Sequence, residues 1–139
     1  MVGIHRLLSI KFLFMRRFSF LFIAVFFLSC QGNDGLTLQQ DRAALLVLFD
    51  EIETISNSIV CDDASDWNFV AYGHKACGGP QGYVAYSNQI DVPAFLILIE
   101  NYTQAERNYN IKWGIISTCD LPAVPTGVRC ENGDAVLNY

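Results

Sequence analysis

Basic residues are scarce in this sequence, and they are unevenly placed. The chain of 139 residues has nine Lys and Arg residues against fourteen Asp and Glu residues. Four of the nine lie within the first 29 residues, which contain no acidic side chain. The rest of the chain therefore carries five basic and fourteen acidic residues, a formal charge of −9. Binding to nucleic acid requires a basic surface against the phosphates, so this composition argues against a nucleic acid partner.

Long apolar runs and histidines are also few. The most apolar stretch, Phe18–Leu28, has eleven residues, whereas a membrane-spanning helix needs about 20. His5 and His74 are the two histidines, and no pair of cysteines has C-x2-C spacing. A zinc site would therefore have few ligands to draw on, and no cofactor is expected.

The residues around the apolar stretch are those of an export signal. Arg16 and Arg17 precede it, and the small Ser29 follows it, directly before Cys30. This order is typical of a secretory signal peptide. The Ser-Cys ending resembles the lipobox of bacterial lipoproteins, in which the cysteine becomes the mature N-terminus and carries lipid. The alternative is an ordinary signal peptide whose cleavage site contains a cysteine.

The resemblance to lipoproteins divides the chain into three parts. Residues 1–29 are the signal peptide, and translation starts either at Met1 or, in the more compact layout, at Met15. Residues 30–36 form a lipid-anchored tether, in which residues 31–35 are polar and glycine-rich. In enterobacterial lipoproteins an Asp after the cysteine signals retention at the inner membrane. Gln31 stands here instead, so the resemblance implies the outer membrane of the cell envelope.

Two helices are predicted in the remaining domain, residues 37–139. Thr37 begins a capping box, and apolar residues at helical spacing predict a helix over 38–58. Asp91 is a suitable N-cap, Gly114 a suitable C-terminal stop, and the regular spacing between them predicts a helix over 92–113. In this second stripe Glu106 is the single charged intruder.

Four strands are predicted beside the helices. Residues 67–72 and 82–87 are rich in aromatic and β-branched side chains and are expected to pair as a hairpin. Residues 128–131 and 134–138 flank Asn-Gly, the favoured pair for a two-residue turn. The order predicts an α+β fold, in which two helices pack on a small antiparallel sheet in a single small disulfide-linked domain.

Four cysteines remain when Cys30 is set aside. An even number in an exported domain indicates two disulfides. Cys61–Cys130 with Cys77–Cys119 is the preferred pairing, because each bond ties the strand region to the C-terminal part across the second helix. The local pairing, Cys61–Cys77 with Cys119–Cys130, stays open, as does a zinc site.

Two segments resemble small exported bacterial proteins for which no activity is agreed. These are the string C-G-G-P-Q-G-Y-V-A-Y-S from Cys77 to Ser87 and the C-terminal part, which has S-T-C from Ser117 to Cys119, then Pro125, then C-E-N-G from Cys130. The resemblance covers about residues 60–137. Proteins of this kind often have another cysteine pair, at positions that correspond to those near Trp67 and Ala135, and this chain lacks both of its members. Loss of both together suits neighbouring strands linked by Cys61–Cys130. It carries over no functional residue.

Aromatic side chains offer the most extended candidate binding surface. Trp67, Tyr72, Tyr83 and Tyr86 lie in the two predicted strands of the first hairpin and could form a face that binds a sugar or a peptide. The alternative is that they pack in the core, which is the usual place for such side chains.

Other candidate groups have simpler explanations. His74 lies three residues before Cys77, as in a Cys–His nucleophile, but a disulfide at Cys77 would remove the thiol. Three acidic residues at 62, 63 and 66 could bind calcium weakly, yet they lack the other ligands of an EF-hand loop. The Gly78-Gly79 pair is better explained by a sharp turn than by an anion site.

Two classes of function follow. The first is a lipid-anchored, non-enzymatic module that binds a protein or a small ligand, with inhibitor-like recognition included. The second is a small cell-envelope hydrolase. A hydrolase should bring His74 together with Asp or Ser side chains in a cleft, whereas a binding module should expose an apolar or aromatic patch.

Overall fold

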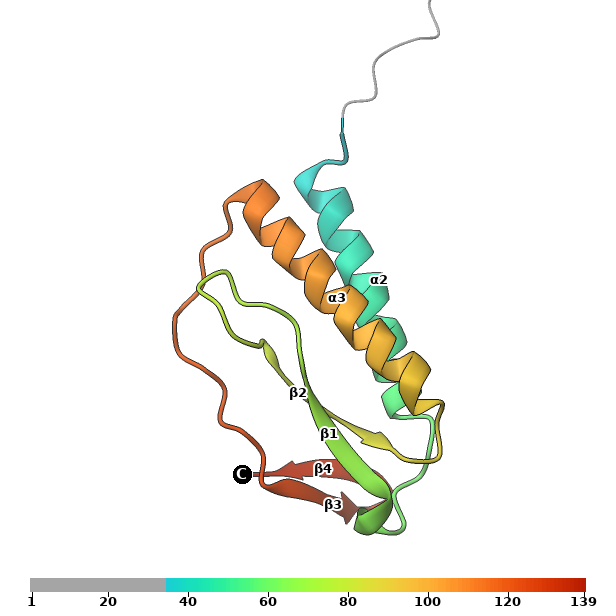
Figure 1. Cartoon of the computed structure of the whole chain (residues 1–139). Coiled ribbons are helices and arrows are strands. Elements are labelled where there is room, and N and C mark those ends of the chain that lie inside the picture. The colour runs from blue at the N-terminus through green and yellow to red at the C-terminus, as the bar shows by residue number, and fades with distance from the viewer. Residues whose placement is uncertain (1–34) are drawn as a thin grey trace, which may run out of the picture. The chain divides into compact units, whose positions relative to one another are not determined.

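The computed structural model describes residues 35–139 (Figure 1). The predicted signal peptide, Met15, Cys30 and most of the tether lie outside the described residues. The elements follow one another as α2 (Leu38–Ser56), the short 3-10 helix η1 (Ala64–Asp66), β1 (Trp67–Tyr72), β2 (Gly82–Ser87), α3 (Val92–Trp113), β3 (Gly127–Glu131) and β4 (Asp134–Asn138). The predicted α+β fold in one small domain is confirmed.

Helix α2 begins where its capping box predicts. The Thr37 side chain accepts a hydrogen bond from the Gln40 N–H, and the Gln40 side chain accepts one from the Thr37 N–H. The helix ends two residues earlier than predicted, at Ser56, and Asn57 is the C-cap. The Ser56 hydroxyl donates to the Glu53 carbonyl in this last turn, which gives the backbone a polar partner as the helix ends.

Helix α3 has the predicted bounds, and both of its caps are standard. The Asp91 carboxylate accepts from the Ala94 N–H, and Gly114 closes the helix with φ at +59°, a conformation that glycine adopts without steric cost. The two helices run antiparallel, because Trp113 at the end of α3 donates to Asp41 at the start of α2. Figure 1 shows them side by side.

The four strands form two separate antiparallel sheets of two strands each, rather than one sheet. Trp67 pairs with Ser87 at one end of the β1–β2 hairpin, and Tyr72 with Gly82 at the other. Asn132 and Gly133 have φ values of +54° and +91° in the β3–β4 turn, as a two-residue hairpin turn requires. The expected single sheet is therefore corrected: the two hairpins pack through side chains and do not share a ladder.

Alternation along β1 and β2 gives each face of that hairpin its own core. Toward the helices, a first core is built on four buried side chains, Ile52, Phe95, Ile99 and Tyr102. Toward β3–β4, a second core is built on Cys61, Trp67 and Ala85. The β1–β2 hairpin therefore lies between the helices and the β3–β4 hairpin, and both faces of its strands are used.

Both preferred disulfides are present. Cys61 bonds Cys130 within the second core, and Cys77 bonds Cys119 near the surface, each with Cα atoms 5.3 Å apart. The second disulfide joins the 73–81 loop to the strand-free segment that follows α3. Lys75 strengthens this junction, because its buried ammonium donates to the Asp120 carbonyl at 2.5 Å.

Candidate binding site

A groove of about 430 Å³ lies beside β2. We call it the β2 groove. One wall is the second half of α2, and the other is β4. Its lining consists of Phe49, Glu53, Ser56, Asn57, Trp67, Tyr72, Tyr83, Val84, Ala85, Ala135, Val136, Leu137 and Tyr139. The volume lies within the range of about 300–1,000 Å³ that is usual for ligand sites.

Three of the four predicted aromatic residues line the β2 groove. Trp67 and Tyr72 extend into it from β1, and Tyr83 belongs to β2 itself. Tyr86 does not line it. Its ring packs against Phe95, with centroids 5.4 Å apart, next to the first core. Trp67 and Tyr72 also contact the cores, so the structure places the same rings both in packing and beside a cavity.

Gly82 allows Tyr72 to reach the groove. A Cβ atom at Gly82 would lie 3.0 Å from the Tyr72 hydroxyl oxygen and 3.1 Å from a ring carbon. The end of the ring therefore lies over the backbone of β2 at a position where β2 has no side chain. Burial raises the pKa of the Tyr72 hydroxyl, and the negative charges of Glu106 and Glu53 raise it further.

The bottom of the groove is the outer edge of β2. Tyr83, Val84 and Ala85 are consecutive, and all three line the cavity, although their side chains alternate between the two faces of the strand. Within residues 35–139, β1 is the single strand that pairs with β2. The edge of β2 that points away from β1 therefore faces the cavity. Side chains from both faces of β2 line the cavity beside this edge.

Glu53 is the acidic side chain of the groove. Its carboxylate takes no part in the three ion pairs or in the side-chain hydrogen bonds of residues 35–139. The exposed Tyr139 ring lies on the same lining. The groove therefore combines aromatic walls, a strand edge and one negative charge that has no basic partner in the described part of the chain.

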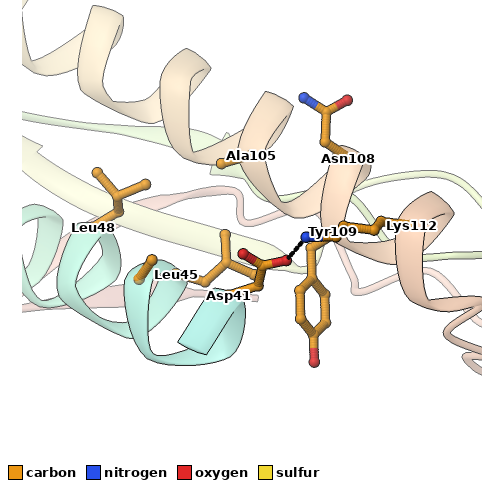
Figure 2. A pocket seen from close by; sticks show the side chains of 8 residues that line it. Asp41, Leu45, Leu48, Ala105, Asn108, Tyr109 and Lys112 are labelled. Carbon is orange, nitrogen blue, oxygen red and sulfur yellow. Dashed lines mark hydrogen bonds and ion pairs between the residues drawn. The ribbon is translucent and has the colours of Figure 1, made fainter. Parts of the chain in front are cut away.

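A second cavity, of about 270 Å³, lies between the two helices (Figure 2). Its charged groups, Asp41 and Lys112, are only 2.5 Å apart. Hydrogen bonds from Lys112 and then from Trp113 lower the pKa of the Asp41 carboxyl. Because these charges neutralise each other, this cavity offers a ligand less unsatisfied polarity than the β2 groove.

The comparisons with protein-family models, with curated proteins and with solved structures found no match to this chain. Two further findings concern residues 35–139. None of the helices there is long and apolar enough to cross a membrane. In the same residues, no three His, Cys, Asp or Glu side chains gather as a metal site would require.

His74 and Cys77 do not form a catalytic pair in this structure, because Cys77 is bonded to Cys119. His74 holds the 73–81 loop to α3 through its backbone. Its N–H donates to the Glu106 carboxylate at 2.5 Å, and its carbonyl accepts from the Asn110 side chain at 2.6 Å. The His74 Nδ1 atom is buried and has no hydrogen-bond partner among the described residues.

Glu106 is the residue whose role the sequence reasoning missed. As well as the His74 N–H, its carboxylate accepts a hydrogen bond from the Gln81 side chain at 3.0 Å. It thus joins both ends of the 73–81 loop to α3. The only sequence signal was its position as a charge within an apolar stripe, which indicates a polar partner without naming it.

Proposed function

We propose that this chain is an exported bacterial lipoprotein, anchored by lipid on Cys30 at the outer membrane, whose 37–139 domain is a non-enzymatic binding module. The observation that carries the export part is the pair of disulfides, Cys61–Cys130 and Cys77–Cys119. Stable disulfides belong to proteins of oxidising compartments. The lipobox-like Ser29-Cys30 supplies the reason for an anchor, and Gln31 the reason for the outer membrane.

The β2 groove supports the binding part of the proposal. Its walls are held on regular elements, and the Cys61–Cys130 bond ties β3 to the segment between α2 and η1 within the second core. A site on a rigid frame loses little conformational entropy when a ligand binds. The aromatic lining residues, which include Trp67, Tyr83 and Tyr139, combine apolar rings with polar N–H or O–H groups.

A small cell-envelope hydrolase remains the second candidate, and the surroundings of His74 favour it less. His74 lines a cavity of about 370 Å³, together with Ala76, Arg107, Asn110, Ile111, Gly114 and Ile115. This lining offers no carboxylate to orient the imidazole and no hydroxyl or thiol as nucleophile, which are the groups that such chemistry needs.

Fractionation of cells that express the full chain tests the anchor. We expect the wild-type protein in the outer-membrane fraction, and the Cys30→Ser variant either released in soluble form or left uncleaved in the inner membrane. Ser29→Ala is the matched control, because it keeps a small residue before the cysteine and should be processed normally. Cleavage and membrane retention of Cys30→Ser would refute the anchor.

A further inference from the structure

We infer that the β2 groove binds an extended peptide segment of a partner protein, which adds as a third strand along the outer edge of β2 and carries a basic side chain toward Glu53. This inference rests on the proposed binding function and names the class of ligand. It depends first on the backbone of β2, then on the two walls of the groove, and last on charge.

The hydrogen-bond pattern of the β1–β2 hairpin shows which backbone groups face outward. The Asn88 N–H donates to the Asp66 carbonyl, which continues the register beyond Trp67 and Ser87. In an antiparallel ladder, hydrogen-bonded pairs alternate with pairs that make no such bonds. The even-numbered residues of β2 therefore bond to β1, and the N–H and C=O groups of Tyr83 and Ala85 point toward the groove.

These outward groups have no partner in residues 35–139. None of the backbone bonds outside the helices and ladders involves Tyr83 or Ala85, and no side chain bonds to their backbone. Ala85 is nevertheless only 9% exposed. A buried backbone group without a hydrogen bond is costly, and a peptide strand would supply donors and acceptors at the matching spacing.

The available edge is short and has a defined end. The Ser87 carbonyl accepts from the Ile90 N–H, and the Ser87 hydroxyl accepts from Gln89, so the turn after β2 occupies the edge beyond Ala85. At about 3.3 Å per residue, the Tyr83–Ala85 edge and the cavity beside it suit a core of about three peptide residues.

The two walls predict an alternating peptide sequence. Successive side chains of an added strand point to opposite faces, one toward α2 and the other toward β4. The wall on the α2 side carries Glu53, and the wall on the β4 side carries Ala135 and Leu137. The expected peptide therefore has a Lys or Arg next to an apolar residue in the strand, in either order.

Charge favours the same ligand. Glu53 has no ion-pair partner within the described residues, and residues 30–139 carry a formal charge of −9. A cationic segment would be drawn to this surface and would neutralise the carboxylate in the groove. A glycan could stack on the rings of Trp67 and Tyr83. Its sugar units, however, would not place hydrogen-bonding groups at the spacing of the backbone N–H and C=O groups along β2.

The experiment uses the full chain, purified in detergent with both disulfides intact, and a combinatorial library of peptides of about nine residues. The best binder is then resynthesised with N-methyl groups at single backbone positions. Methylation at alternate positions, those facing β2, should weaken binding about tenfold, and methylation at the positions between them should not. Bound peptide should also slow amide exchange at Tyr83 and Ala85. Because the peptide is changed and not the protein, misfolding cannot imitate this pattern.

A matched pair of variants tests the charge. Glu53→Gln should weaken a lysine-containing peptide about two- to fivefold, whereas Glu51→Gln, on the same helix but off the groove lining, should leave binding unchanged. An equal effect of both variants would contradict the role of Glu53. Failure of every peptide in the library, binding without the alternating methyl pattern, or selective binding of soluble oligosaccharides at the groove would overturn the inference. None of these results would alter the processing at Cys30, so failure of the peptide site is distinguishable from failure of the anchor.

Discussion

Replacement of Ile99 by alanine perturbs the packing of α3 on the β1–β2 hairpin. Ile99 is 5% exposed and belongs to the first core, beside Ile52, Phe95 and Tyr102. An Ile→Ala change at such a site removes three methyl or methylene groups and leaves a cavity, at a cost of about 2–5 kcal/mol. For a domain of this size, we expect the Tm to fall by about 10–25 °C, with the native fold retained at low temperature.

Ile97→Ala is the matched control, because the same substitution is made two residues away on the same helix. Ile97 is 63% exposed, so its loss should change the free energy of unfolding by no more than about 0.5 kcal/mol. Urea unfolding without reductant, followed by tryptophan fluorescence, measures both variants. If the two variants lost the same stability, or if Ile97→Ala lost more, the stripe assigned to the core would be the wrong face of α3.

Three further outcomes are expected. The pKa of Asp41 is lowered in the folded state, chiefly by the hydrogen bond from Lys112. Its contribution to stability should therefore be complete above the pKa of an unfolded Asp, about 3.9, and should be lost as the pH falls through the lower folded value. If Asp41→Asn lost stability at low pH in the same way as the wild-type protein, this would be contradicted. Thr37→Ala removes the capping bond to Gln40 and should lower the free energy of unfolding in urea by about 0.5–2 kcal/mol. An unchanged midpoint of urea unfolding would mean that this cap does not stabilise α2. Changing Cys77 and Cys119 to alanine removes a bond that closes a separation of 42 residues, and should lower the free energy of unfolding by about 4 kcal/mol. In wild-type residues 36–139, a thiol reagent should label the cysteines only after reduction. Labelling before reduction would show that the disulfides are absent.

The helices could be predicted from the sequence because their signals are local. Asp91 and Gly114 mark the ends of α3, and the structure places its bounds there. The β3–β4 hairpin could be predicted for a similar reason, because the local Asn132-Gly133 pair forms the turn that sets its register. The end of α2 was placed two residues late because no glycine marks it, and the last turn of a helix without such a stop has no sharp boundary in the sequence.

The contacts between elements could not be predicted in the same way. Whether β2 and β4 share a ladder depends on how the two hairpins approach each other in space, and the small Ala85 in the second core lets them meet through side chains. The β2 groove is a consequence of that arrangement. Tyr86 was grouped with the aromatic surface because it lies in the same strand as Tyr83, but alternation turns its ring toward Phe95.

The intact mass of the full chain, extracted from membranes without reductant, tests the central proposal most directly. The proposal predicts the mass of residues 30–139, increased by two or more acyl groups and decreased by four hydrogen atoms for the two disulfides. A mass that fits an unmodified chain cleaved elsewhere, or one that still includes residues 1–29, would contradict the anchor. A mass without the loss of four hydrogens would contradict the disulfides on which the proposal of export depends.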